Sequence, residues 1–283
     1  MKITKAVIPV AGMGTRFLPI TKSIPKEMLP IIDTPTIHFI VSECINSGIK
    51  EILFITSGNK KTLEDYFDDN YELEKRIGSG PKLEVLNKVK DIYKNIKIYF
   101  IRQGEPMGSG HAIKLAKEFV GNDSFAVLYG DDLMYSKNVP VLKQLINLHE
   151  EKMANIIGVQ EVRHEDTYKY GIVDINSEYK INKLVEKPKI EEAPSNLAGL
   201  GRYIVSSNIF PILENLSSGA NGEYQFTDAM AILMKKEPFY SCKFDGTYYD
   251  TGSKLGYLKA IVDFALLNEE LSKDFKEYLN TIK

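Results

Sequence analysis

Short apolar runs alternate with longer amphipathic stretches along the first part of the chain. The runs Lys5–Val10 and Glu51–Thr56 are rich in Val and Ile, which is typical of strands buried on both faces. Between them, a helical stripe of apolar residues at spacings of three and four consists of Ile37, Ile40, Val41, Cys44 and Ile45. We expect Thr34 as the N-cap of this helix, Pro35 as its first residue and Gly48 just beyond its end. The order strand, helix, strand predicts a βαβ unit with a parallel sheet.

The same order returns further along the chain. We predict a strand over Lys97–Arg102, a helix from about Ser109 to Val120 and a strand over Ser124–Tyr129. Between the two units, residues 60–95 are dense in Lys, Glu and Asp and are interrupted by Gly78-Ser79-Gly80-Pro81. This segment predicts a helical insertion. Two interpretations stay open: the insertion forms a lid or a subunit contact, or it is a pair of solvated helices.

Strand and helix patterns continue into the second half, where Asn176-Ser177 suggests a hairpin and hence a mixed sheet. The predicted strands are Ile156–Val162, Gly171–Ile175 and Lys180–Glu186, and the predicted helices are Asn208–Leu216, Thr227–Lys236, Ser253–Leu267 and a charged helix ending near Ile282. We predict one α/β domain over residues 1–283, with a Rossmann-like, mixed but mainly parallel central sheet flanked by helices. It carries the helical insertion at about 60–95 and a C-terminal helical segment at about 253–283.

The composition is that of a globular enzyme, with 43% hydrophobic and 26% charged residues in a chain of 283. The 36 Lys and Arg nearly balance the 38 Asp and Glu, which argues against a nucleic-acid partner. No apolar run approaches the roughly 18 residues of a membrane span, and the first residues lack the features of a signal peptide. Cys44 and Cys242 lie far apart, without the spacing of a disulfide framework or a zinc site. We therefore expect a cytoplasmic protein with no membrane partner.

A glycine-rich turn, Ala11-Gly12-Met13-Gly14-Thr15-Arg16, follows the first predicted strand. Glycine lets backbone N–H groups approach a phosphate or a base edge, because no Cβ keeps the ligand away. A dinucleotide fingerprint would need a third glycine where this chain has Phe17, and the Walker pattern is absent, so hydride transfer and Walker-type hydrolysis lose their main support. Arg16 and Lys26 follow the turn and are the cation types that bind phosphate, so we expect them to hold a triphosphate.

The turn and the segment Pro-Lys-Glu-Met-Leu-Pro over residues 25–30 together resemble motifs of the nucleotidyltransferases that make sugar nucleotides. The amino-acid sequence of residues 25–30 resembles the bacterial UDP-glucose pyrophosphorylases in particular. The similarity runs over nearly the whole chain. It implies the reaction of UTP with α-D-glucose 1-phosphate to give UDP-glucose and pyrophosphate. It also implies that the first turn binds substrate through Ala11, Gly12, Gly14 and Thr15.

A second glycine turn, Gly108-Ser109-Gly110-His111, follows Arg102-Gln103-Gly104. In the family, the matching Gln and Gly contact the uracil, which implies substrate-binding roles for Gln103, Gly108 and Gly110. A glutamine amide offers both a donor and an acceptor to a pyrimidine edge. We expect His111 to cap or pack the helix start and assign it no catalytic role.

Gly130-Asp131-Asp132 follows a predicted strand, at the edge where open α/β sheets bind ligands. Mg²⁺ prefers one or two carboxylates together with phosphate oxygens. Since neighbouring side chains of an extended chain point to opposite sides, we expect one metal ligand here, and the resemblance selects Asp131, with Asp132 capping the next turn. Asp250-Thr251-Gly252 is similar to a segment that supplies a second metal carboxylate in related thymidylyltransferases, although Asp250 suits equally the N-cap of the following helix.

Glu186-Lys187-Pro188 follows another predicted strand and matches a family motif in which the glutamate holds sugar hydroxyls and the lysine the sugar phosphate. Gly171 matches the glycine whose backbone lies against the hexose. The block Gly222–Asp228 also matches the family, and we expect it to be scaffold and site wall.

The implied chemistry needs no general base, because a sugar phosphate with a second pKa of about 6 is mostly ionised at neutral pH. Positioning and electrostatics then carry catalysis, and we expect Arg16, Lys26, Asp131 and Lys187 to be the catalytic residues, with Mg²⁺ bound by Asp131 and Asp250. Two alternatives stay open, a glucose-1-phosphate thymidylyltransferase and a non-catalytic nucleotide-sugar-binding protein. The resemblance and the charged insertion also favour a homodimer or a homotetramer.

Overall fold

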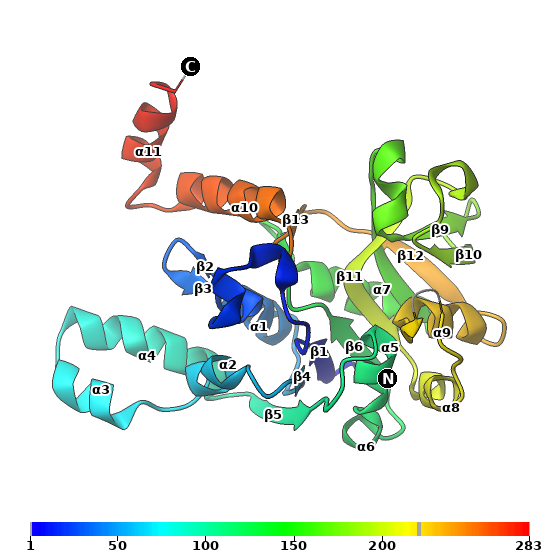
Figure 1. Ribbon diagram of the computed structural model, residues 1–283, viewed down its shortest axis with the longest axis horizontal. Coiled ribbons are helices and arrows are strands. Elements are labelled where there is room, and N and C mark those ends of the chain that lie inside the picture. Colours follow the sequence, from blue (N-terminus) through cyan, green and yellow to red (C-terminus); the bar gives the residue numbers. More distant parts are fainter. Residues whose placement is uncertain (1, 220–221, 283) are drawn as a thin grey trace.

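The computed structural model describes residues 2–219 and 222–282 (Figure 1). Its strands are β1 (Lys5–Pro9), β2 (Pro30–Ile31), β3 (Thr34–Pro35), β4 (Glu51–Thr56), β5 (Lys97–Arg102), β6 (Phe125–Leu128), β7 (Asp132–Tyr135), β8 (Asn155–Glu161), β9 (Gly171–Ile175), β10 (Ile181–Glu186), β11 (Leu197–Val205), β12 (Phe239–Lys243) and β13 (Thr247–Asp250). Its α-helices are α1 (Thr36–Asn46), α2 (Lys61–Tyr66), α3 (Tyr71–Ile77), α4 (Pro81–Tyr93), α5 (Ser109–Lys114), α6 (Lys117–Val120), α7 (Val141–Lys152), α8 (Phe210–Glu214), α9 (Phe226–Leu233), α10 (Lys254–Leu267) and α11 (Ser272–Leu279).

A central sheet of nine strands runs through the described part of the chain in the order β10-β9-β11-β6-β1-β4-β5, with β8 pairing β11 and β12. Strands β6, β1, β4 and β5 are parallel, as the two predicted βαβ units require. Strand β11 runs antiparallel to β6, and β9 and β10 form the expected antiparallel hairpin. The predicted α/β fold with a mixed, mainly parallel sheet is therefore confirmed.

The side chains of β1 alternate between two apolar cores, one on each face of the sheet. Ala6 and Ile8 belong to the core that α1 and α7 cover, whereas Val7 belongs to the core that α5, α8 and α9 cover. Both cores exclude solvent from these side chains, and each fully buried aliphatic side chain contributes about 1.5–3 kcal/mol. The continuous apolar run of β1 is explained by burial on both faces.

Two boundaries in the first half differ from expectation. Thr34 and Pro35 pair with β2 as the short strand β3, so Pro35 is the N-cap of α1 and Thr36 its first residue. The helix expected from Ser109 to Val120 is broken into α5 and α6, because Leu115 and Ala116 donate to carbonyls three residues earlier and tighten the chain.

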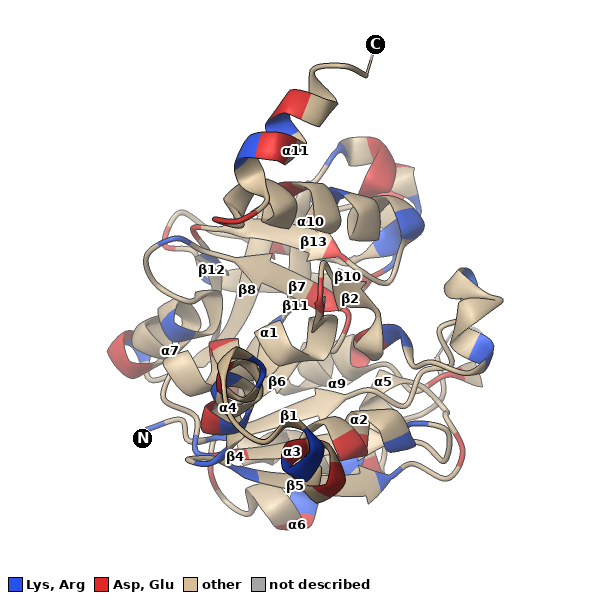
Figure 2. Cartoon of the chain, turned by 90° about the vertical axis from the view of Figure 1, so that its left-hand side faces the viewer, with Lys and Arg blue, Asp and Glu red and all other residues tan. Residues whose placement is uncertain are grey.

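The insertion at about 60–95 consists of the helices α2, α3 and α4. Helices α3 and α4 extend from one side of the molecule and carry many charged residues (Figures 1 and 2). Lys90 of α4 forms ion pairs with Asp69 at 3.0 Å and with Glu74 of α3 at 2.5 Å. The ring of Phe67 stacks on Phe54 of β4 at 5.6 Å, which anchors the start of the insertion to the sheet.

Several elements of the second half are absent from the sequence-based prediction. Strand β11 contains Gly199, Gly201 and Arg202, which break the apolar pattern although the strand is buried. Strands β7 and β13 are short and pair with each other, and β12 joins the sheet beside β8. Helix α10 packs on β13, and α11 continues away from the body of the molecule (Figure 1). None of the helices in the described ranges has the length and apolar content that a membrane crossing requires.

Candidate active site

The first glycine turn lies at the carboxyl edge of the sheet, folded tightly against Lys26. Gly14 has a φ of 65°, and its carbonyl accepts a hydrogen bond of 2.8 Å from Thr21 Oγ1. A Cβ on Gly14 would lie 3.2 Å from Lys26 Cβ, and one on Gly12 would lie 3.9 Å from Lys26 Nζ. Glycine is therefore required at position 14 by both its backbone conformation and its close packing.

Lys26 forms an ion pair with Asp131, which follows β6, the neighbour of β1 in the sheet. Both side chains are mostly buried, with 18% and 26% exposed. Burial by itself lowers the pKa of Lys26, but the Asp131 carboxylate outweighs it and raises this pKa above its usual value. Burial likewise opposes ionisation of Asp131, yet Lys26 holds the pKa of Asp131 below its usual value. Both groups are thus charged at neutral pH.

Asp132 belongs to the small β7–β13 sheet rather than to a turn. It pairs with Asp250 in register, and its Oδ1 accepts a hydrogen bond of 2.8 Å from Tyr248 Oη. The expectation that Asp132 caps the following turn is wrong, because Asp132 begins an extended strand. Burial and the nearby Asp131 carboxylate raise the pKa of Asp132 to about 7.

Asp250 and Asp131 converge on Gly252. A Cβ on Gly252 would lie 3.1 Å from Asp250 Oδ1 and would also meet Asp131 Oδ2. The N-cap of α10 is Ser253, whose Oγ accepts a hydrogen bond of 3.2 Å from the backbone of Gly256, so Asp250 does not cap this helix. Burial and then the nearby Asp131 carboxylate raise the pKa of Asp250, because each disfavours a negative charge on Asp250. Two converging carboxylates are a donor set that fits Mg²⁺.

The third group of predicted residues lies where the hairpin of β9 and β10 ends. Glu186 pairs in register with Gly171, and a Cβ on Gly171 would lie 3.2 Å from Glu186 Oε2. The backbone N–H of Lys187 donates to the Tyr170 carbonyl at 3.0 Å, while its side chain is 55% exposed and has its Nζ 3.5 Å from Glu186 Oε1. The lysine is therefore free to turn toward an anion.

One cavity of about 1180 Å³ connects Arg16 with the two carboxylates and the end of the hairpin, whereas Lys26 and the glycines of the first turn do not line it. Its wall includes the predicted site residues Arg16, Asp131, Gly171, Glu186, Lys187 and Asp250. Residues from four separate parts of the sequence thus face one space, with cations and carboxylates on its wall.

The second glycine turn reaches that cavity only through Ser109, whereas Gln103, Gly108 and Gly110 do not line it. Gln103 follows β5, is only 3% exposed and shares a hydrogen bond of 2.7 Å with His111. A Cβ on Gly108 would lie 2.6 Å from the Tyr224 carbonyl oxygen, and Gly110 donates its backbone N–H to the same oxygen at 2.7 Å. The block that contains Tyr224 therefore crosses over this turn, as expected of scaffold and site wall.

Known proteins are similar to this chain in sequence and in fold. A family model described as nucleotidyl transferase matches residues 5–265. The chain belongs to the nucleotidyl transferase family. A Staphylococcus epidermidis relative named UTP–glucose-1-phosphate uridylyltransferase is 45% identical over 285 aligned residues, which cover 99% of this chain and 99% of that protein.

Two solved structures of UDP-glucose pyrophosphorylases are also similar to this member of the nucleotidyl transferase family. One, complexed with UDP-glucose, has a TM-score of 0.87 and 40% identity over 94% of this chain and 100% of its own. The other, from Acinetobacter baumannii and bound to UTP, has a TM-score of 0.90 and 38% identity over 99% of this chain and 100% of its own. The resemblance expected from the motifs is confirmed.

Other polar residues that support the site of this family member have no motif of their own. Arg202 is fully buried, forms an ion pair of 2.7 Å with Glu43 and donates to the Asp132 carbonyl at 2.9 Å. Thr251 Oγ1 donates to the Asp131 carbonyl at 2.7 Å. In the sequence, Glu43 stands directly beside Cys44, which belongs to the apolar stripe of α1. This position was the one sign that Glu43 is buried and therefore needs a charged partner.

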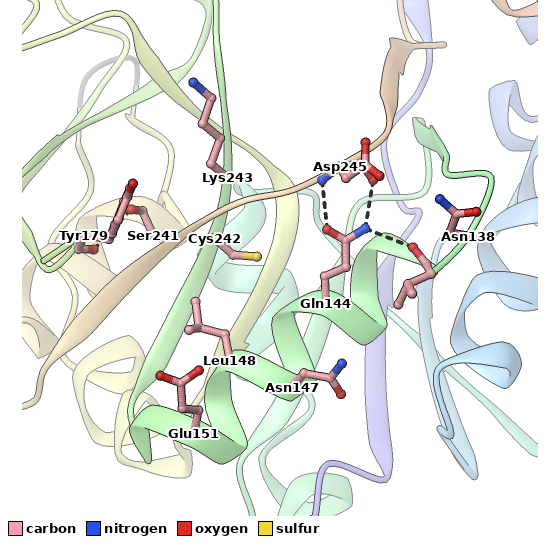
Figure 3. A pocket seen from close by; sticks show the side chains of 11 residues that line it. Asn138, Gln144, Asn147, Leu148, Glu151, Tyr179, Ser241, Cys242, Lys243 and Asp245 are labelled. Atoms are coloured by element: carbon pink, nitrogen blue, oxygen red, sulfur yellow. Dashed lines mark hydrogen bonds between the residues drawn. The ribbon is translucent and has the colours of Figure 1, made fainter.

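A second cavity of about 820 Å³ lies between α7 and β12 (Figure 3). None of the predicted site residues lines it. The Gln144 amide on its wall donates to the carbonyls of Val139 and Asp245 at 2.9 and 2.8 Å, and accepts from the Asp245 backbone at 2.8 Å. These bonds tie two loops together, which is a structural role.

Proposed function

We propose that the protein transfers the uridylyl group of UTP to α-D-glucose 1-phosphate, giving UDP-glucose and pyrophosphate. The observation that carries this proposal is that Arg16, Lys187 and the two converging carboxylates Asp131 and Asp250 lie on the wall of one cavity. The UTP and UDP-glucose bound in the solved relatives support the choice of substrates.

In the proposed reaction, a phosphate oxygen of glucose 1-phosphate attacks the α-phosphorus of UTP. The new O–P bond forms as the bond between the α-phosphorus and the bridging oxygen breaks, and pyrophosphate leaves with that oxygen. The attacking oxygen is already ionised, so no side chain has to remove a proton. The chain has to bring two polyanions together and offset their repulsion, which is catalysis by positioning and electrostatics.

We assign the side chains on this basis. Arg16 and Lys26 bind the triphosphate, Lys187 binds the sugar phosphate, and Glu186 holds sugar hydroxyls beside the Gly171 backbone. The mostly buried position of Lys26 supports its assignment, because a charged amine in a low-dielectric site attracts phosphate more strongly than one in water. The first turn with Ala11, Gly12, Gly14 and Thr15 is the proposed nucleotide-binding loop, and Gln103, Gly108 and Gly110 form the proposed uracil site.

The proposed cofactor is Mg²⁺, held by Asp131 and Asp250. When bound, such an ion neutralises negative charge on the reacting phosphates. The raised pKa of Asp250, caused by burial and then by Asp131, supports this choice, since a divalent cation relieves the repulsion between the two carboxylates.

We further propose that the protein is a homodimer or a homotetramer in the cytoplasm. Exposed apolar side chains on the C-terminal helices support an association, among them Leu255, Leu258 and Tyr278. The free thiols Cys44 and Cys242 are consistent with a reducing compartment. Light scattering after size-exclusion chromatography measures the mass, and a monomer at micromolar concentration would contradict the first part.

Pyrophosphate release tests the proposed function. We expect release only when UTP, glucose 1-phosphate and Mg²⁺ are all present, and slower release when dTTP replaces UTP. Hydrolysis of UTP without sugar would refute the transferase, equal rates with dTTP would refute the uridine preference, and binding without release would favour a nucleotide-sugar-binding protein. Lys26→Ala, checked by circular dichroism for folding, is expected to lower kcat by about two to three orders of magnitude.

A further inference from the structure

The proposed base site contains a hydrogen-bonded pair of side chains, of which Gln103 is buried and His111 half-buried. Gln103 lies at the end of β5 with 3% of its surface exposed, and its Nε2 is 2.7 Å from Nδ1 of His111 at the start of α5. In this orientation of the amide, its nitrogen is the donor and Nδ1 of His111 is the acceptor. His111 is thus neutral with its proton on Nε2. Burial and then Lys114 lower the pKa of His111, which agrees with a neutral ring at pH 7.

The histidine is itself held in place. The backbone of Gly110 donates to Tyr224, whose ring lies 6.5 Å from the His111 ring, centroid to centroid. The Glu105 carbonyl also acts on the imidazole as a hydrogen-bond acceptor. A ring fixed from several sides presents its lone pair in one direction, so it selects one of the two orientations of the Gln103 amide.

That orientation matters for a pyrimidine. Among the side-chain hydrogen bonds of the described residues, Gln103 takes part in this one through Nε2, which leaves its Oε1 for a base. Uracil presents an N3–H donor next to the O4 acceptor, whereas cytosine presents an N3 acceptor next to an amino donor. Cytosine would need the amide turned over, which would place Oε1 against the lone pair of His111 Nδ1, two acceptors facing each other.

We propose that His111 is a positioning residue that makes the site select uracil over cytosine by fixing the orientation of the Gln103 amide. This inference rests on the proposed function, in which Gln103 contacts the base. It deepens that function by naming the residue that sets the base specificity, one that does not itself touch the reacting phosphates.

The test compares kcat/KM for UTP, CTP and dTTP in pyrophosphate release, with saturating glucose 1-phosphate and Mg²⁺. We expect His111→Phe, which keeps a ring but removes the acceptor, to lower the UTP:CTP ratio about tenfold, the scale of one hydrogen bond to a buried polar group, mainly through KM for UTP. The UTP:dTTP ratio should change less than about twofold, because thymine has the same N3–H and O4 as uracil. His111→Asn places an acceptor near the position of Nδ1 and should restore most of the UTP:CTP ratio.

His164→Phe is the matched control, because it removes another histidine that forms one side-chain hydrogen bond, to Asn196 at 3.0 Å. It should leave all ratios unchanged. If His111→Phe does not fold, His111→Lys, a donor only, should lower the UTP:CTP ratio in the same way. Equal loss with all three nucleotides, or an unchanged UTP:CTP ratio, would overturn the inference. Wild-type protein that is inactive with UTP would instead refute the proposed function.

Discussion

A single substitution in the ion pair between Lys60 and Glu27 should lower the free energy of unfolding much more than one in a surface ion pair. Their side chains are only 2% and 1% exposed, and Lys60 Nζ lies 2.7 Å from Glu27 Oε2. Glu27 Oε1 is buried without a hydrogen-bond partner among the described residues. Glu27 follows Lys26 in the chain and packs below Gly130, where a Cβ would lie 3.3 Å from Glu27 Cγ. The pair therefore joins the start of the insertion to the loop that carries Lys26.

Lys60→Met leaves the Glu27 carboxylate buried without its partner. Breaking a buried ion pair in this way costs about 3–5 kcal/mol of the free energy of unfolding. For a chain of this size the melting temperature should fall by roughly 10 °C. The double variant Lys60→Met with Glu27→Gln should recover much of that loss, because no unpaired charge remains buried.

The loss should also depend on pH. Burial raises the pKa of Glu27, and Lys60 opposes this effect, so removal of Lys60 raises the pKa of Glu27 further. A carboxyl group whose pKa is higher in the folded than in the unfolded state loses stability as pH rises through the folded value. The deficit of Lys60→Met relative to wild type should therefore be larger at pH 8 than at pH 5.

Urea unfolding followed by circular dichroism at pH 5, 6.5 and 8 measures the deficit directly. Lys61→Met is the matched control, since Lys61 is the next residue and is exposed. It should change the free energy of unfolding by less than about 0.5 kcal/mol. The reasoning fails if Lys60→Met is as stable as this control at pH 8, or if its deficit is larger at pH 5.

Three further substitutions follow from the site. Gly108→Ala should lower the free energy of unfolding by about 2 kcal/mol or more in thermal unfolding, because Gly108 has a φ of 103° and a Cβ there would lie 2.6 Å from the Tyr224 carbonyl oxygen. The control Gly104→Ala should lower it far less, because a Cβ on Gly104 meets nothing within 4 Å. The free energy of unfolding of Asp132→Asn should increase by about 2 kcal/mol relative to that of wild type between pH 5 and pH 8. The reason is that the pKa of Asp132 is raised to about 7, so its ionisation destabilises the wild-type fold as pH rises. An equal difference between the two proteins at both pH values would contradict this. Asp250→Asn should raise the Mg²⁺ concentration for half-maximal pyrophosphate release at least about tenfold, and an unchanged midpoint would remove Asp250 from the metal site.

The sequence by itself determined the parallel half of the sheet. Strands such as β1 and β4 are continuous runs of β-branched and apolar residues, and α1 has a complete apolar stripe, so local patterning and burial agree there. The family, too, was visible in local motifs, because a loop that approaches a nucleotide needs glycine at fixed positions and cations close behind it.

Only the tertiary structure decided how the second half is built. Strand β11 is hidden in sequence by its two glycines and by Arg202, a charge that is buried because Glu43, far away in the chain, neutralises it. Asp250 was equally a helix cap or a site carboxylate until the pairing of β13 with β7 placed it beside Asp131. Such contacts join residues more than a hundred positions apart, and no local pattern encodes them, since their free energy arises only when the chain has already brought the partners together.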